Sequence, residues 1–336
     1  MALLFCDSFD HYDTSRILLK WTSMPGACTI GAVGRNGTSG LNAPGSQRYV
    51  TWNFLAAKQT VVSGFAWRAN SGTAVIIWAC RDAGTTQVDL RYNSAQKLEI
   101  TRNGTVLATG ATTITTGVFN YIEVKVKVAS GTSGTYEVRI NGVVELISAG
   151  ANTQFTANAT CDSFLLGNNA SSGFGTSHDF DDVYLCDTLG TYNTDFLGDI
   201  RVQALLPNAA GNYSQWTPTA GANYTNVDEN PPNDDTDYVA SSTVGQIDTY
   251  GFSDLTPTSG FIRAVQFIMD ARKDDAGTRQ IAAVVRQSGA DYVGVTKSIN
   301  ASYAFYVDIM DSNPATSTTW TLAEVNADEF GIKVIA

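Results

Sequence analysis

The sequence is short of basic residues. Its 336 residues include 21 Lys and Arg against 32 Asp and Glu, which gives a formal net charge of −11 at pH 7. Proteins that bind nucleic acid neutralise phosphates with Lys and Arg, so this balance argues against a nucleic-acid partner. Charged residues make up only 16% of the chain, whereas Gly, Ser, Thr, Asn and Ala are abundant, as is typical of short strands joined by many turns.

Long apolar runs are also missing. No uncharged apolar stretch reaches about 18 residues, so we expect no membrane insertion. The opening residues MALLFCDSFDHYD lack a basic n-region, and Cys6 and Asp7 interrupt their apolar run. We therefore expect no secretory signal peptide and a protein assembled in a cytoplasm.

Cysteine is sparse and unpaired in the sequence. The five cysteines form no C-x-x-C pair and are odd in number, which disfavours a disulfide framework or a structural zinc site. We interpret them as small buried apolar residues. They are Cys6, Cys28, Cys80, Cys161 and Cys186.

The sequence also lacks the motifs that carry catalysis. There is no G-x-S-x-G elbow and no G-x-x-x-x-G-K-S/T phosphate cradle. Retaining glucanases place paired carboxylates on one strand as E-x-D-x-x-E, and this pattern is missing too. The two glutamates nearest in sequence, Glu324 and Glu329, lie five residues apart. These absences predict a protein that is not an enzyme, with no catalytic residues.

Apolar and polar residues alternate along much of the chain, whereas helical periodicity is rare. In 121–130, Ile122, Val124, Val126 and Val128 share one face of a strand, with charged residues on the other. We expect this strand to pair with 135–147, where Asn-Gly forms a hairpin turn, as a second Asn-Gly does after residue 102. The N-terminal FCDSFDHY should pair with HDFDDVYL near residue 180.

The pattern predicts two domains, since a single core rarely exceeds about 250–300 residues. We expect an all-β protein with one β-sandwich over 1–187, a hinge over 188–198 and a second sandwich over 199–336. Within the second half, 199–207 is strand-like and Pro207 should end it. Residues 208–237 show no periodicity and predict a long functional or partner-contacting loop without regular structure. One helical turn is expected within 321–330.

Two sets of polar residues are candidates for metal binding. His178 precedes three aspartates, with His11 as a further ligand if the termini pair, but strand alternation puts His178 and Asp182 on one face and Asp181 on the other. The loop 227–237 could gather oxygens around calcium, although it lacks EF-hand spacing. We otherwise expect no cofactor. The loop's candidate ligands are Asp228, Asp234, Asp235 and Asp237.

Aromatic residues in the same region are candidates for partner contact. Trp216 lies in SQWTP, where an exposed ring could anchor another subunit. Tyr213 and Tyr224 flank it on either side. We therefore expect this region to contact other proteins or further copies of the chain in a homo-oligomer.

Residues 121–147, CDSFLLGN and HDFDDVYLCD resemble the closing strands of a concanavalin A-like jelly roll of the laminin-G or pentraxin type. The resemblance covers residues 1–187 and implies a lectin-like fold. FLGDIRVQALLPN, QWTP, NYTNVDENPPNDDTDYV and EFGIKVIA resemble a family of virion structural proteins of tailed bacteriophages and prophages. This second resemblance covers nearly the whole chain.

Together these resemblances imply a non-enzymatic structural component of a phage particle, present in several copies. The second domain would dock to other virion proteins of the tail or decorate the capsid, and the lectin-like domain would face outward toward a host-surface glycan. The location implied is the virion, assembled in the host cytoplasm. The alternative is a carbohydrate-binding module or enzyme of a bacterial glycan-active protein, which would require secretion and, for the enzyme, paired carboxylates.

Overall fold

The computed structural model describes residues 2–169, 177–256 and 259–336. The chain divides into two compact units, Met1–Val202 and Gln203–Ala336, here called unit 1 and unit 2. The hinge expected over 188–198 falls within unit 1. The residues that follow the expected hinge still contact unit 1, because the backbone N–H of Val202 donates to Asp182 Oδ1 at 2.6 Å.

Unit 1 has a large sheet of eight strands, in the order β12, β11, β10, β5, β14, β3 and β2, with β1 paired to β14 beside this path. The strands are β1 Leu3–Asp7, β2 Thr29–Gly31, β3 Gly40–Pro44, β5 Thr60–Ala69, β10 Phe119–Lys127, β11 Gly134–Ile140, β12 Val143–Ala151 and β14 Ser177–Cys186.

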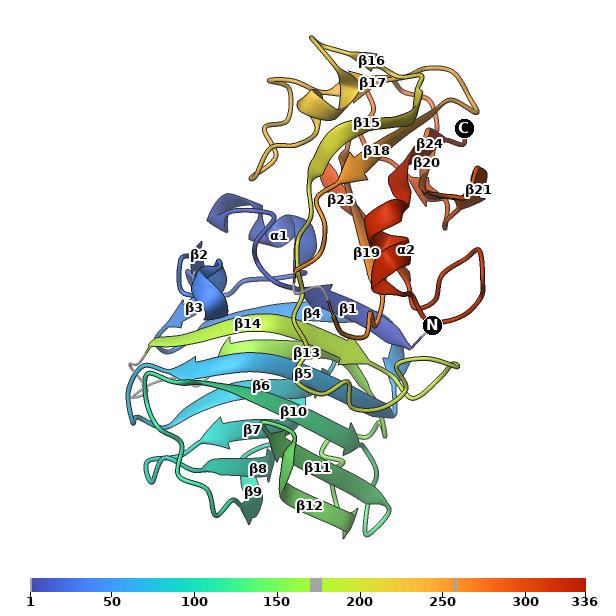
Figure 1. The fold of residues 1–336 in the computed structure, drawn as a ribbon. Helices are drawn as coiled ribbons and strands as arrows, with labels where there is room; N and C mark the ends of the chain where they lie inside the picture. Colours follow the sequence, from blue (N-terminus) through green and yellow to red (C-terminus); the bar gives the residue numbers. More distant parts are fainter. Residues whose placement is uncertain (1, 170–176, 257–258) are drawn as a thin grey trace. The chain divides into compact units, whose positions relative to one another are not determined.

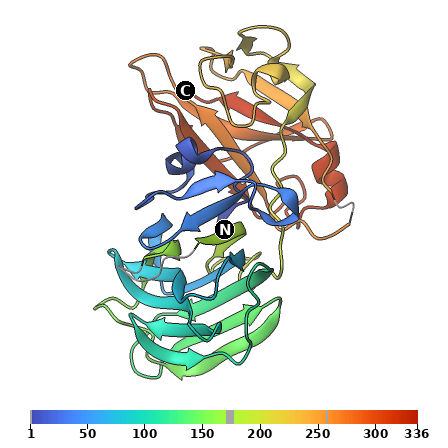
Figure 2. The ribbon, with the colours of Figure 1, turned by 90° about the vertical axis from the view of Figure 1, so that its left-hand side faces the viewer.

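The small sheet of unit 1 has six strands, in the order β4, β13, β6, β7, β8 and β9. Figures 1 and 2 show the two sheets as stacked layers. The strands are β4 Arg48–Lys58, β6 Val75–Asp82, β7 Thr85–Tyr92, β8 Leu98–Arg102, β9 Thr105–Thr109 and β13 Cys161–Asn168; the short helices are η1 Thr14–Arg16, α1 Ile17–Lys20 and η2 Arg35–Gly37.

Local sequence signals in unit 1 are confirmed. Strand β10 pairs with β11, and β1 pairs with β14. Asn103 and Asn141, each followed by Gly, have positive φ at their hairpin turns, which the Asn-Gly dipeptide favours. All five cysteines are free and buried, and Trp67 and Trp78 lie wholly within the core.

Unit 2 has one six-stranded sheet, in the order β15, β18, β24, β20 and β21 with β22 on β20, and two two-stranded sheets, β16–β17 and β19–β23. The elements are β15 Pro207–Ser214, β16 Thr217–Pro218, η3 Asn223–Asn226, β17 Val239–Ala240, β18 Ile247–Phe252, β19 Val265–Ala271, β20 Gln280–Gln287, β21 Ala290–Val293, β22 Lys297–Ser298, β23 Ala304–Met310, α2 Leu322–Ala327 and β24 Glu329–Val334.

The core of unit 2 lies between its six-stranded sheet and β19–β23. Phe267 of β19 meets Phe330 of β24 with ring centroids 5.6 Å apart, and Trp320 and Val325 join the same cluster. Helix α2 begins with a capping box between Thr321 and Glu324. The helical turn expected within 321–330 is therefore confirmed. The prediction of an all-β chain with two β-sandwiches, the first of jelly-roll type, is confirmed.

Two expectations for the start of unit 2 are wrong. No strand forms over 199–206, and Pro207 begins β15 instead of ending a strand. The reason is that proline tolerates the first position of an edge strand, where its nitrogen needs no partner. The segment 208–237 likewise contains regular structure, including most of β15 and all of η3. Among the described helices, none is long and apolar enough to span a membrane.

Candidate functional site

The outer face of the large sheet in unit 1 carries an ordered set of polar side chains. Strand register places Glu123 of β10 opposite Gly64 of β5 and opposite Arg139 of β11. Tyr184 of β14 also lies opposite Gly64. Directly opposed residues point to the same side of a sheet, so these side chains share the face that is turned away from the core.

A glycine makes the central contact on this face possible. A Cβ at Gly64 would lie 2.1 Å from Cε1 of Tyr184, so any side chain there would displace the tyrosine ring. With Gly64 in place, the Tyr184 hydroxyl donates to Glu123 Oε1 at 2.6 Å. Both side chains are fully buried, and burial raises the pKa of Tyr184 well above its ordinary value.

Residues 195–202, here called the strap, cover this pair. The backbone N–H of Leu197 donates to the Tyr184 hydroxyl at 3.1 Å, and that of Gly198 donates to Glu123 Oε1 at 2.9 Å. The other carboxylate oxygen of Glu123, Oε2, has no hydrogen-bond partner among the described residues. The buried carboxylate is therefore only half satisfied.

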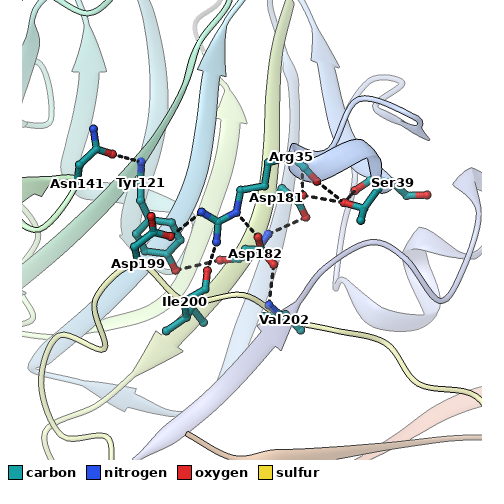
Figure 3. A network of polar contacts seen from close by, with 10 residues as sticks. Arg35, Ser39, Tyr121, Asn141, Asp181, Asp182, Asp199, Ile200 and Val202 are labelled. Carbon is teal, nitrogen blue, oxygen red and sulfur yellow. Dashed lines mark hydrogen bonds and ion pairs between the residues drawn. The ribbon is translucent and has the colours of Figure 1, made fainter. Parts of the chain in front are cut away.

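Arg35 fastens the strap at its other end (Figure 3). Its guanidinium donates to Asp182, to Asp199 Oδ1 at 2.5 Å and to the carbonyl of Ile200. The guanidinium carbon lies 5.2 Å from the ring centre of Tyr121, whose hydroxyl donates to the Asp182 carbonyl at 3.0 Å. We call Glu123, Tyr184, Arg35, Asp182 and Tyr121 the covered cluster.

A β-bulge brings two adjacent carboxylates to Arg35. The β14–β5 register shifts between Asp181 and Tyr184, and Asp182 has φ of 47°. Asp181 Oδ2 accepts from the Arg35 backbone N–H at 2.8 Å, while Asp182 accepts from its side chain. The alternation expected for this strand, with Asp181 and Asp182 on opposite faces, is therefore wrong, because a bulge interrupts the two-residue period.

Burial raises the pKa of both carboxyl groups. For Asp181 it reaches about 7, first because of burial and then because of the neighbouring charge of Asp182; hydrogen bonds from backbone N–H groups act in the opposite direction. For Asp182 burial also raises the pKa, and the charge of Arg35 opposes it. The Asp181 carboxyl group therefore keeps its proton up to about neutral pH.

A second group of polar side chains lies on the same face, here called the open cluster: Asn42, Arg68, Asn70, Ser177 and Asp179. Asp179 is 1% exposed. Its Oδ2 accepts from Arg68 Nε at 2.9 Å, from Arg68 Nη2 at 2.7 Å and from Asn70 Nδ2 at 2.8 Å. Its Oδ1 accepts from Asn42 Nδ2 at 2.6 Å.

This arrangement leaves atoms that can donate or accept hydrogen bonds at the surface. Because both amide nitrogens donate to a carboxylate, the side-chain oxygens of Asn42 and Asn70 are left as acceptors. Asn70 is exposed, and the Arg68 side chain is 27% exposed. The Arg68 guanidinium also stacks 4.6 Å from the ring centre of Phe119. The cluster thus presents donors, acceptors and an aromatic ring in fixed positions.

The structure places the expected partner-contact residues in unit 2. Trp216 is partly buried against the unit 2 core, and its indole N–H donates to the Gln246 carbonyl at 3.3 Å. The Tyr213 hydroxyl donates to Asp291 Oδ2 at 2.9 Å, and Arg286 stacks on its ring. Tyr224 lies in η3 and is partly buried. Partner contact by these residues stays a prediction.

The acidic loop of unit 2 engages protein groups. Asp235 Oδ1 accepts from Arg272 Nη2 at 2.8 Å and from Tyr303 at 3.0 Å. Asp237 Oδ1 accepts from Asn233 at 2.5 Å, Asp234 has a positive φ of 57°, and Asp228 is partly buried. Within the described ranges, no group of three or more His, Cys, Asp or Glu residues is arranged to hold a metal ion.

The two histidines lie within unit 1. His178 is buried and stacks on Trp67 with ring centroids 5.7 Å apart, and burial lowers its pKa to about 4. His11 lies edge-on to Tyr12, and burial lowers its pKa to about 3. Both side chains are therefore neutral at pH 7.

No family model and no curated protein matches the sequence. Among solved structures, an endo-β-1,4-glucuronan lyase from the fungus Trichoderma reesei matches with a TM-score of 0.41 and 14% identity, over 54% of this chain and 94% of the lyase. An alginate lyase matches with a TM-score of 0.41 and 11% identity, over 54% and 95%.

A sialidase from Trypanosoma rangeli matches with a TM-score of 0.36 and 12% identity, over 47% of this chain and 26% of the sialidase. These similar structures are carbohydrate-active enzymes. They contradict two of our expectations, the structural role in a phage particle and the absence of enzymatic activity, and both are wrong. The resemblance to virion proteins, the virion location and the virion partners stay predictions that nothing in these comparisons tests.

Sequence reasoning missed both clusters. Asn42, Arg68 and Asp179 lie far apart in the sequence and meet only because β3, β14 and β5 are neighbours in the sheet. One signal was present: Glu123 was expected on the polar face of its strand, as found. No pattern in the sequence indicated that residues 195–202 would cover it.

Proposed function

We propose that unit 1 is a glycan-binding module of a carbohydrate-active protein and that the open cluster is its binding site. The observation that carries the proposal is the buried carboxylate of Asp179, which holds Arg68, Asn42 and Asn70 in fixed orientations. Side chains that are already ordered lose little entropy on binding, which is the condition for useful affinity at a small polar site.

The chemistry of the cluster suits sugars. A sugar hydroxyl both donates and accepts hydrogen bonds, and the cluster offers amide oxygens as acceptors beside a guanidinium as donor. The ring of Phe119, stacked on Arg68, adds an apolar surface of the kind that usually lines ligand sites.

An array of immobilised glycans probed with the full chain tests the proposal. We expect retention of at least one class of polysaccharide and loss of that retention in Asn70→Ala. Asn70 is exposed, so the substitution should leave folding intact.

Asn158→Ala is the matched control, because Asn158 also donates its amide to a carboxylate, Asp82 of the small sheet, at 3.1 Å. Retention by the control and loss in Asn70→Ala support the site. An array with no retained glycan, or binding that Asn70→Ala leaves unchanged, contradicts the proposal.

A further inference from the structure

We propose that the ligand of this face is an acidic polysaccharide and that it binds the covered cluster by displacing the strap. This inference rests on the proposed function and extends it. In the structure, the strap places its own acidic side chains on the cations that such a ligand would require.

The strap supplies two carboxylates to the sheet. Asp195 Oδ1 lies 3.0 Å from Lys125 Nζ, and Asp199 Oδ1 lies 2.5 Å from Arg35 Nη1. The two aspartate side chains are 62% and 53% exposed, so both carboxylates lie on the solvent side of their cations. Ion pairs this exposed are weak and are screened by salt. Carboxylates that arrive from solvent can therefore replace them.

The strap also covers a third cation. The ring of Phe196 lies 4.0 Å from the guanidinium carbon of Arg139. Arg139 Nε donates to Glu137 Oε1 at 2.7 Å, which leaves its terminal nitrogens as further donors toward a planar carboxylate. When the strap leaves, Lys125, Arg139 and Arg35 become accessible together on one face.

The half-satisfied carboxylate of Glu123 is the independent sign of a ligand. Glu123 is fully buried, and its Oε2 has no hydrogen-bond partner in the described part of the chain. A buried acceptor without a donor is unfavourable. A sugar hydroxyl can supply that donor, which the strap, bound only to Oε1 through Gly198, does not.

The two clusters lie on the same face of the large sheet. Arg68 is opposite Phe119 in β10, and Lys125 lies six residues further along the same strand. At a rise of about 3.4 Å per residue, these positions are separated by roughly 20 Å. A single polysaccharide chain can therefore contact the open cluster and the covered cluster at once, with its carboxylates on the cations.

Titration of the full chain with an oligogalacturonate and with its carboxyl-reduced, neutral counterpart tests the inference. We expect the wild type to bind the acidic oligomer more tightly than the neutral oligomer. The double variant Asp195→Asn/Asp199→Asn should bind it roughly threefold to tenfold more tightly still, because the competing ion pairs are gone. Affinity for the neutral oligomer should not change.

Asp235→Asn is the matched control, since its 63% exposed carboxylate pairs with Arg272 in unit 2. Amide hydrogen exchange supplies a second measurement: saturating acidic oligomer should reduce protection at Leu197, Gly198 and Val202. Equal affinity for both oligomers, no gain in the double variant, or unchanged protection of these amides overturns the strap inference. If the glycan array is blank and neither oligomer binds, the proposed function fails as well.

Discussion

The two clusters on the large sheet are built around the same chemical group and differ in what satisfies it. In the open cluster, the buried carboxylate of Asp179 accepts four hydrogen bonds, all from side chains of Arg68, Asn42 and Asn70. In the covered cluster, Glu123 accepts two, both at Oε1, and one of them comes from the strap. The open cluster is complete without a cover, whereas the covered cluster depends on one.

The difference has a physical origin in the neighbours of each carboxylate. Arg68 lies directly opposite Asp179 in the strand register and pairs with it. Arg139 lies directly opposite Glu123 but donates to Glu137 on its own strand. Glu123 thus remains buried without a cation among its described hydrogen-bond partners. This favours the binding of a further hydrogen-bond donor.

Removal of Arg68 should have the largest effect on stability. Arg68→Ala leaves Asp179 buried without its cation, and we expect the free energy of unfolding to fall by about 4 kcal/mol. Arg139→Ala is the contrast: its partner Glu137 is 20% exposed, so a loss of about 1 kcal/mol is expected. Denaturant unfolding measures both. Equal losses would contradict the claim that Asp179 depends on the cation opposite it whereas Glu123 does not.

Asp181→Asn should change the pH dependence of stability. The folded-state pKa of about 7 lies above the ordinary 3.8, so between pH 4 and 7 the folded state holds a proton that the unfolded state releases. Through this group, stability falls as pH rises across that window. The asparagine variant should lack this fall, a relative gain on the order of 3 kcal/mol at pH 7.

The pH dependence is read from the difference between the unfolding free energies of the variant and the wild type. This subtraction cancels His178, whose lowered pKa makes stability fall as pH drops below about 6.5. Asp235→Asn, whose pKa is lowered by its hydrogen bond from Arg272, should keep the wild-type slope across pH 4 to 7. A wild-type slope in Asp181→Asn would contradict the assigned burial.

Gly64→Ala tests how the covered cluster is held. The added methyl would meet the Tyr184 ring, which must then move away from Glu123 and from the Leu197 N–H. We expect a loss of about 2 kcal/mol in unfolding free energy and faster hydrogen exchange in the strap. Gly31→Ala is the control, because nothing lies within 4 Å of its Cβ position. An equal response of the two variants would count against the glycine's role.

Phe196→Ala should have the smallest effect. It removes the ring that lies over Arg139, a cation–π contact of about 1 kcal/mol. We expect the loss to appear as faster exchange of the Leu197 and Gly198 amides, with little change at Asn70 in the open cluster. Faster exchange throughout unit 1 would show that the strap is part of the core fold.

The sequence was sufficient for what depends on local pattern. Alternation in β10 correctly placed Ile122 inward and Glu123 outward, and Asn-Gly dipeptides correctly marked two hairpins. It failed where one residue breaks the period, as the bulge at Asp182 does, and where the chain folds back over a face, as the strap does over Glu123. Such contacts join residues more than 70 positions apart, and no local pattern encodes them.

The most direct test of the account is a hydrogen-exchange map of the full chain, with and without a saturating oligosaccharide that the array identifies. We predict new protection at the ends of β3, β5 and β14, around Asn42, Asn70 and Asp179. Protection confined to unit 2, or none at these strands despite bound glycan, would contradict the central claim that the outer face of the large sheet binds sugar.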